Sequence, residues 1–135
     1  MNLPQIQDAI EERLATAGFS CDPGVLNLTM KIKKLPCAAA YFVGFAETPE
    51  ETDTDTFVAR FRVDLIFSLM DAQAFRDQLL TGVSAFYAQI RTDRSLGGLV
   101  DTTTVSDGGI PEFTETTIPA AVKMLFVEVE FEEDA

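Results

Sequence analysis

One stretch of the chain, residues 57–100, changes its hydrophobic period twice and constrains the fold more than any other feature. From Phe57 to Phe67 every odd position is apolar. The charged residues of this segment occupy even positions, and they are Arg60, Arg62 and Asp64. Because successive side chains of a strand point to opposite faces, this alternation predicts a long strand with one apolar face and one charged face.

The next part of the stretch has the period of a helix. Apolar residues recur there every three or four positions, at Phe75, Leu79, Val83, Phe86 and Ile90. This spacing predicts an amphipathic helix over residues 71–91, which needs a sheet to pack against. Ser68 and Asp71 are predicted to form a capping box at its start. Gly97 and Gly98 follow, and since glycine tolerates positive φ, we interpret them as a structural turn into another strand.

The other elements can be predicted in the same way. An apolar stripe predicts a helix near the N-terminus, with Gly18 as its C-cap; the stripe consists of Leu3, Ile6, Ile10 and Leu14. Alternating or apolar runs predict four more strands, at residues 26–32, 38–46, 99–106 and 122–131. Residues 38–46 are apolar at both parities, which is typical of an interior strand covered on both faces.

Length and composition predict one domain spanning residues 1–135. Hydrophobic residues make up 47% of the chain, and no apolar run approaches the roughly 20 residues that a membrane-spanning helix requires. The N-terminus has neither the basic start nor the apolar core of a signal sequence. We therefore expect an α+β fold, made in a cytoplasm, with a mixed, mostly antiparallel sheet of four to five strands and two main helices packed on one face.

An acidic segment, ETPEETDTDT at residues 47–56, contains no hydrophobic residue and predicts a flexible hairpin arm between two strands. Its DTD sequence lacks the glycine and glutamate of an EF-hand calcium loop, so a solvated loop is favoured over a metal site. Long polar loops in compact domains are often functional. The arm is therefore a candidate contact with another subunit or partner.

The net charge of −12 argues against free nucleic acid as a ligand, because binding phosphates requires a basic surface. The acidic surplus is concentrated in residues 47–55 and 128–134. The simplest interpretation is solubility. In a ring of several copies, the same segments would instead form a charged collar.

Catalytic chemistry finds little support. The chain has no histidine, which removes imidazole bases, Ser-His and Cys-His pairs and histidine metal sites. The adjacent acids at residues 11–12, 50–51 and 132–133 are expected to be solvated. Cys21 and Cys37 show no metal-binding spacing, which favours reduced thiols, with a disulfide as a minor alternative. No enzyme activity, cofactor or metal site is predicted.

The charged side chains of the central strand leave two interpretations open. Three alternating charges on such a strand require water, cover or a partner, so they form either a solvated ladder or a subunit contact. The complete set of candidate interface residues is Glu47, Glu50, Glu51, Asp53, Asp55, Arg60, Arg62 and Asp64.

The order of these elements resembles a known family. The segments CAAAYFVGFAE, VDLIFSL, RSLGGLVDTTTV and FVEVEFEE, together with the two helices, are similar to the tail-terminator and minor tail proteins of long-tailed bacteriophages. The most specific part of the likeness is the LGGLV turn directly after the long helix. The resemblance covers nearly the whole chain.

This resemblance implies a structural virion protein, assembled in the bacterial cytoplasm, that forms a ring of commonly six copies at the head-proximal end of a tail tube. Its expected partners are other copies of itself, the tail tube protein and the head-tail connector protein, with DNA only in passage and no membrane. An acidic channel wall would avoid holding DNA. We expect Lys31, Lys33, Arg60 and Arg62 to pair with acids of neighbouring subunits. The alternative is a non-catalytic α+β ligand-binding module with a pocket between helix 71–91 and the sheet; an enzyme using acids alone is a weaker third interpretation.

Overall fold

The computed structural model describes residues 2–21, 35–49, 54–114 and 119–134. Two helices and six strands follow one another in this order: α1 (Leu3–Thr16), β1 (Ser20–Cys21), β2 (Cys37–Pro49), β3 (Thr54–Ser68), α2 (Ala72–Thr92), β4 (Thr102–Asp107), β5 (Glu112–Thr114) and β6 (Ala120–Asp134). The strands form one sheet in the order β1-β2-β3-β6-β4, and β5 pairs with β6 beyond the end of β4. The short β1 runs parallel to β2, whereas the other pairs are antiparallel.

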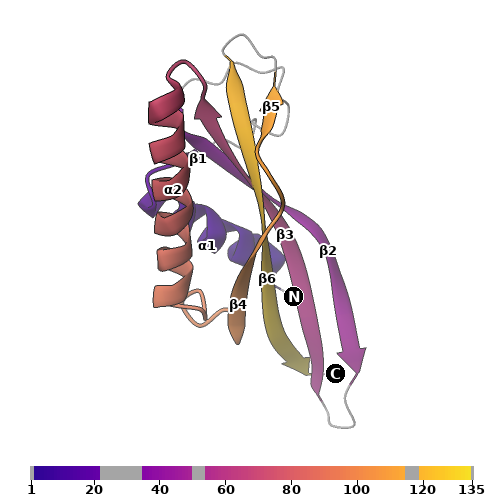
Figure 1. Cartoon of the computed structure of the whole chain (residues 1–135). Helices are drawn as coiled ribbons and strands as arrows, with labels where there is room; N and C mark the ends of the chain where they lie inside the picture. The colour runs from indigo at the N-terminus through magenta and orange to yellow at the C-terminus, as the bar shows by residue number, and fades with distance from the viewer. Residues whose placement is uncertain (1, 22–34, 50–53, 115–118, 135) are drawn as a thin grey trace.

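The predicted fold class is confirmed. Both helices lie on one side of a mostly antiparallel sheet (Figure 1). The core lies between them and the sheet and includes Ile6, Ile10 and Leu14 of α1 and Phe86 and Ile90 of α2. We call the side of the sheet that faces α1 and α2 the helix face and the other side the open face.

Strand β3 is the centre of the sheet because it pairs along its whole length with β6 and along most of its length with β2. Its odd residues from Phe57 to Phe67 are all buried on the helix face, as the alternation predicts. Residues that are paired across an antiparallel ladder share a face. The register of β3 therefore assigns each residue of β2 and β6 to one face.

The helix ends follow from local sequence, with one correction. Gly18 has φ +103°, and the Phe19 amide donates to the Leu14 carbonyl at 3.1 Å, so the predicted glycine C-cap is confirmed. The predicted capping box at α2 is wrong. Asp71 is itself the N-cap, because its carboxylate accepts from the amides of Gln73 and Ala74 at 3.0 and 3.2 Å.

The ends of three strands form an extension that we call the arm: residues 42–49 of β2, 54–60 of β3 and 128–134 of β6. Figure 1 shows these paired ends extending past both helices. The acidic segment is therefore less irregular than predicted, since Thr48 pairs with Thr56 and Pro49 with Asp55. Pairing with β6 supplies the backbone hydrogen bonds that an isolated polar hairpin lacks.

Three other strand predictions have different outcomes. The strand predicted at 26–32 lies outside the described residues. The strand predicted at 99–106 begins later, because β4 starts at Thr102. Between β4 and β6 lies the short strand β5, at a place where we predicted no strand. Strand β6 extends beyond the predicted 122–131 at both ends.

Candidate functional site

The open face of the sheet carries a connected charged cluster at its centre. Arg62 Nε lies 2.9 Å from Asp64 Oδ1, and the Tyr41 hydroxyl donates to Asp64 Oδ2 at 3.3 Å. The Arg62 guanidinium also lies over the Tyr41 ring, 5.3 Å from its centroid. Partial burial, together with the Asp64 carboxylate, raises the pKa of the Tyr41 hydroxyl. The hydrogen bond with Asp64 likewise raises the pKa of Arg62.

Arg60 makes a second set of contacts within the chain. Its guanidinium lies 3.8 Å from the centroid of the Phe126 ring, and its Nε lies 3.8 Å from Glu128 Oε1. Both side chains of this ion pair are about half exposed, so the pair contributes little to stability. Arg60 and Arg62 thus have partners in their own chain, and their expected pairing with acids of a neighbour stays a prediction. Lys31 and Lys33 lie outside the described residues.

The helix face of the arm carries a row of neighbouring aromatic rings. Phe57 and Phe131 stack with their centroids 5.6 Å apart, and Phe45 lies 6.1 Å from Phe57. Phe42 lies 6.4 Å from Phe45 and 5.7 Å from Phe61. The inner rings of the row are buried, but Phe42 is 40% exposed and Phe45 is 54% exposed. The row therefore ends in an apolar surface on β2.

A β-bulge in β2 creates this row. Phe42 pairs with Phe61 and Gly44 with Arg60, so the register shifts around Val43. Without the shift, Phe42 and Phe45 would lie on opposite faces, because their positions differ by an odd number. The extra residue places both on the helix face.

The sequence predicted that β2 is an interior strand, but only its first residues have strand partners on both sides, in β1 and β3. Beyond Ala38, which pairs with β1, its outer edge has no strand partner among the described residues. Val43 is also exposed there. An edge of this kind presents unpaired backbone groups together with apolar side chains, a combination typical of an interaction surface.

The register places the two acidic segments on opposite faces. Glu128, Glu130 and Glu132 alternate with buried apolar residues and lie exposed on the open face. Asp55 has the parity of Phe57 and lies on the helix face, as does Glu47. Their carboxyls share a hydrogen bond, which raises the pKa of Glu47. Among the other predicted interface residues, Glu50, Glu51 and Asp53 lie outside the described part of the chain.

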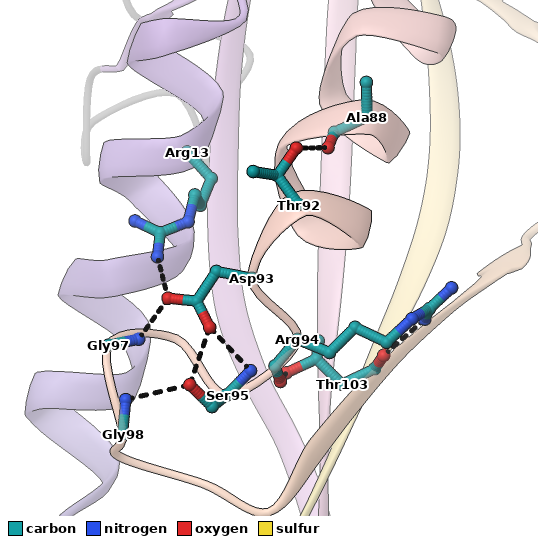
Figure 2. Close-up of polar contacts among 9 residues, drawn as sticks. All are labelled: Arg13, Ala88, Thr92, Asp93, Arg94, Ser95, Gly97, Gly98 and Thr103. Carbon is teal, nitrogen blue, oxygen red and sulfur yellow. Dashed lines mark hydrogen bonds and ion pairs between the residues drawn. The ribbon is translucent and has the colours of Figure 1, made fainter.

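The turn after α2 is held by one carboxylate (Figure 2). Asp93 Oδ1 accepts from the Ser95 hydroxyl at 2.6 Å and from its amide, while Oδ2 accepts from the Gly97 amide at 2.9 Å. Arg13 of α1 reaches the same carboxylate at 3.4 Å. These donors lower the pKa of Asp93, chiefly through the Ser95 hydroxyl and then the Gly97 amide. The turn thus joins the end of α2 to α1.

The turn's conformation agrees with its sequence. Leu96, Gly97 and Gly98 all have positive φ, at 51°, 72° and 86°. The Ser95 hydroxyl accepts from the Gly98 amide at 3.0 Å. Both glycines therefore have the structural role that we predicted, because this left-handed backbone is costly for residues with a Cβ.

A hollow near α2 is the site that the ligand-binding alternative predicts. It measures about 260 Å³ and is lined by Phe19, Phe67 and Gly82 at its apolar part and by Asp77, Gln78 and Thr81 of α2. These three polar side chains are exposed. Ligand sites are typically larger and more enclosed, with polar groups that converge on the ligand. The hollow lacks these features.

Comparison with known proteins gives no family. The chain matches no protein-family model, and no curated protein is significantly similar to it in sequence. No described helix is both long enough and apolar enough to cross a membrane.

Proposed function

We propose that this chain is a structural, non-catalytic subunit of a tail-terminator ring, in which several copies close around the head-proximal end of a phage tail tube. The observation that carries the proposal is the arm. It extends past the helices, has an exposed apolar surface at Phe42, Val43 and Phe45, and carries acids at its end. A projecting element with these properties suits contact with a neighbouring subunit. The resemblance in element order and in the LGGLV turn supplies the particular assembly.

The positions of the acids support a finer assignment within this proposal. The row Glu128, Glu130 and Glu132 lies on the open face, whereas Glu47 and Asp55 lie on the helix face. One channel wall therefore does not include both segments. We assign the open-face row to the channel, where it repels passing DNA phosphates, and the helix-face acids to contacts between subunits.

The proposal is tested by the native mass of the purified chain, followed by electron microscopy. A closed ring of about six copies is the expected result, since a head-to-tail contact that closes gives a ring. The tail tube protein should bind one side of that ring. A stable monomer over the full concentration range would contradict the proposal.

Salt provides a second test. Subunits with a net charge of −12 repel one another, so ring formation should strengthen between about 0.05 and 0.5 M salt as the Debye length shortens. Replacing Glu128, Glu130 and Glu132 together by glutamine should weaken this dependence. Assembly that weakens steadily over the same salt range would argue against an acidic wall.

A further inference from the structure

The outward side of α2 carries a stripe that its core does not use. Spacings of four, four, three and four residues place Arg76, Leu80, Ser84, Tyr87 and Arg91 on one side of the helix. Leu80 is 58% exposed and Tyr87 is 41% exposed. Among the described residues, neither arginine has an ion-pair partner. The stripe therefore has an apolar centre and, at each end, an arginine without an ion-pair partner in the described part of the chain.

The arm carries the complementary order of side chains. Along the helix face of β2 lie Phe42, then Phe45, then Glu47, with Asp55 hydrogen-bonded to Glu47 across the strand pair. The two phenylalanines are exposed, and the acids follow them towards the end of the arm. The arm thus presents two aromatic rings followed by an acid, and the stripe presents a tyrosine, a leucine and an arginine in the same order.

The spacing from the apolar residues to the charged residue agrees in the two series. Leu80 and Tyr87 are about 10 Å apart along a helix with a rise of 1.5 Å per residue, and Arg76 lies about 6 Å beyond Leu80. On the arm, Glu47 lies about 7 Å beyond Phe45 along the strand. The Phe42 and Phe45 ring centroids are 6.4 Å apart, closer together than Leu80 and Tyr87, so the two rings span part of the apolar centre of the stripe. One arm laid along one helix would therefore match the order of the side chains, with the two rings over the apolar centre and the acid beside the arginine.

The two surfaces belong to different subunits in such a contact. Helix α2 uses Phe86 and Ile90 to pack on its own sheet, and the stripe lies on another side of the helix. The arm extends away from the helices (Figure 1). A contact between two different surfaces of identical chains is heterologous, and it propagates from copy to copy until it closes.

We propose that the arm of one copy docks on α2 of the next, with Phe42 and Phe45 against Tyr87 and Leu80 and with Glu47 and Asp55 against Arg76. This inference rests on the proposed function, since it identifies the contact that builds the ring. The pairing also relieves repulsion, because it places a cation beside two adjacent carboxylates of an acidic chain.

The apolar half of the contact is tested by Phe45→Ser and Leu80→Ser, with Phe113→Ser as a matched control. Phe113 is 73% exposed on β5, at the other end of β6. Each test variant should raise the concentration for half-assembly at least about tenfold. The reason is that a few central apolar contacts supply most of the binding energy of an interface, and each variant removes one of them. The control should leave it unchanged. Circular dichroism and thermal melting verify that each variant folds.

The charged half is tested by a swap. Glu47→Arg and Arg76→Glu should each weaken assembly, and the double variant should restore it, because the pair is then reversed but intact. Glu12→Arg, on an exposed position of α1, is the control for the change in net charge. Since Arg76 lies on the helix surface, its substitution tests the contact even if a change in the arm perturbs folding.

The outcomes separate this inference from the proposed function. Wild-type rings that tolerate all four test variants would overturn the docking contact and leave the ring intact. The wild-type chain could instead form open chains or dimers. If these dissociate in Phe45→Ser, and if the charge-swapped double variant assembles again, the contact is supported and the closed ring is overturned. A wild-type chain that stays monomeric would overturn both.

Discussion

The same three strands serve two different purposes in the two halves of the molecule. In the body, the apolar side chains of β3, such as Leu65 and Phe67, are covered by the chain's own helices and are fully buried. In the arm, the same face of the sheet continues without helices, and Phe42 and Phe45 remain exposed. Alternation therefore determines which face is apolar, but it does not determine what covers that face. Exposed aromatic rings in the arm are available for another chain.

The largest expected difference between the halves is in packing. Phe86→Ala removes a fully buried ring from the body and should lower the free energy of unfolding by about 3–5 kcal/mol. Phe45→Ala removes a half-exposed ring from the arm and should cost less than about 1 kcal/mol in the isolated subunit. Urea denaturation of both variants measures this contrast. Equal losses would show that the arm is part of the stabilising core.

Glycine substitutions sharpen the comparison in the backbone. Gly97→Val and Gly98→Val each force a β-branched residue into positive φ and should destabilise by about 1 kcal/mol or more. Gly44→Val in the arm is the matched control, because an added Cβ meets no atom there and the strand accepts valine. Thermal melting should show losses in the turn and none in the arm. Unchanged melting of both turn variants would contradict the role of the turn.

Two threonine substitutions, one in the body and one in the arm, test a smaller effect on stability. Buried Thr103 donates its hydroxyl to the Arg94 carbonyl at 2.7 Å, and Arg94 Nη1 donates back to the Thr103 carbonyl at 2.9 Å (Figure 2). Thr103→Val removes the first bond and should cost about 1 kcal/mol. Thr48→Val, on an exposed arm position, should be close to neutral. The two variants can be compared by chemical denaturation.

The smallest expected effects are in pH dependence, where the two regions differ in sign. The lowered pKa of Asp93 means that its stabilising contribution is present above its unfolded pKa and is lost as pH falls through the folded value. The raised pKa of Glu47 has the opposite consequence, because ionisation is penalised in the folded arm and acid relieves that penalty.

The Asp93→Asn variant should therefore lose less stability than the wild type as the pH falls. The Glu47→Gln variant should lack the small gain in stability that the wild type shows as the pH falls. Carboxyl titrations followed by nuclear magnetic resonance, together with denaturation at several pH values, measure both. Shifts of the same direction at the two carboxyls would contradict this difference between turn and arm.

Local pattern alone determined much of this protein. The alternation around β3, the stripes of α1 and α2, the C-cap at Gly18 and the turn at Gly97 and Gly98 could each be predicted, because their causes lie within a few residues of sequence. The acidic charge and its two concentrations could also be read directly. These features were sufficient to predict the fold class.

Tertiary structure alone decided the candidate interaction surface. The bulge around Val43 changes the face of every later β2 side chain, and the neighbouring Gly44 is compatible with a bulge but does not specify the register. Three features depend on which strands pair and in what register: the open outer edge of β2 beyond Ala38 in the described sheet, the intrachain partners of Arg60 and the opposite faces of the two acidic segments. Those pairings join residues far apart in the chain, so the surface they create exists only once the chain has folded.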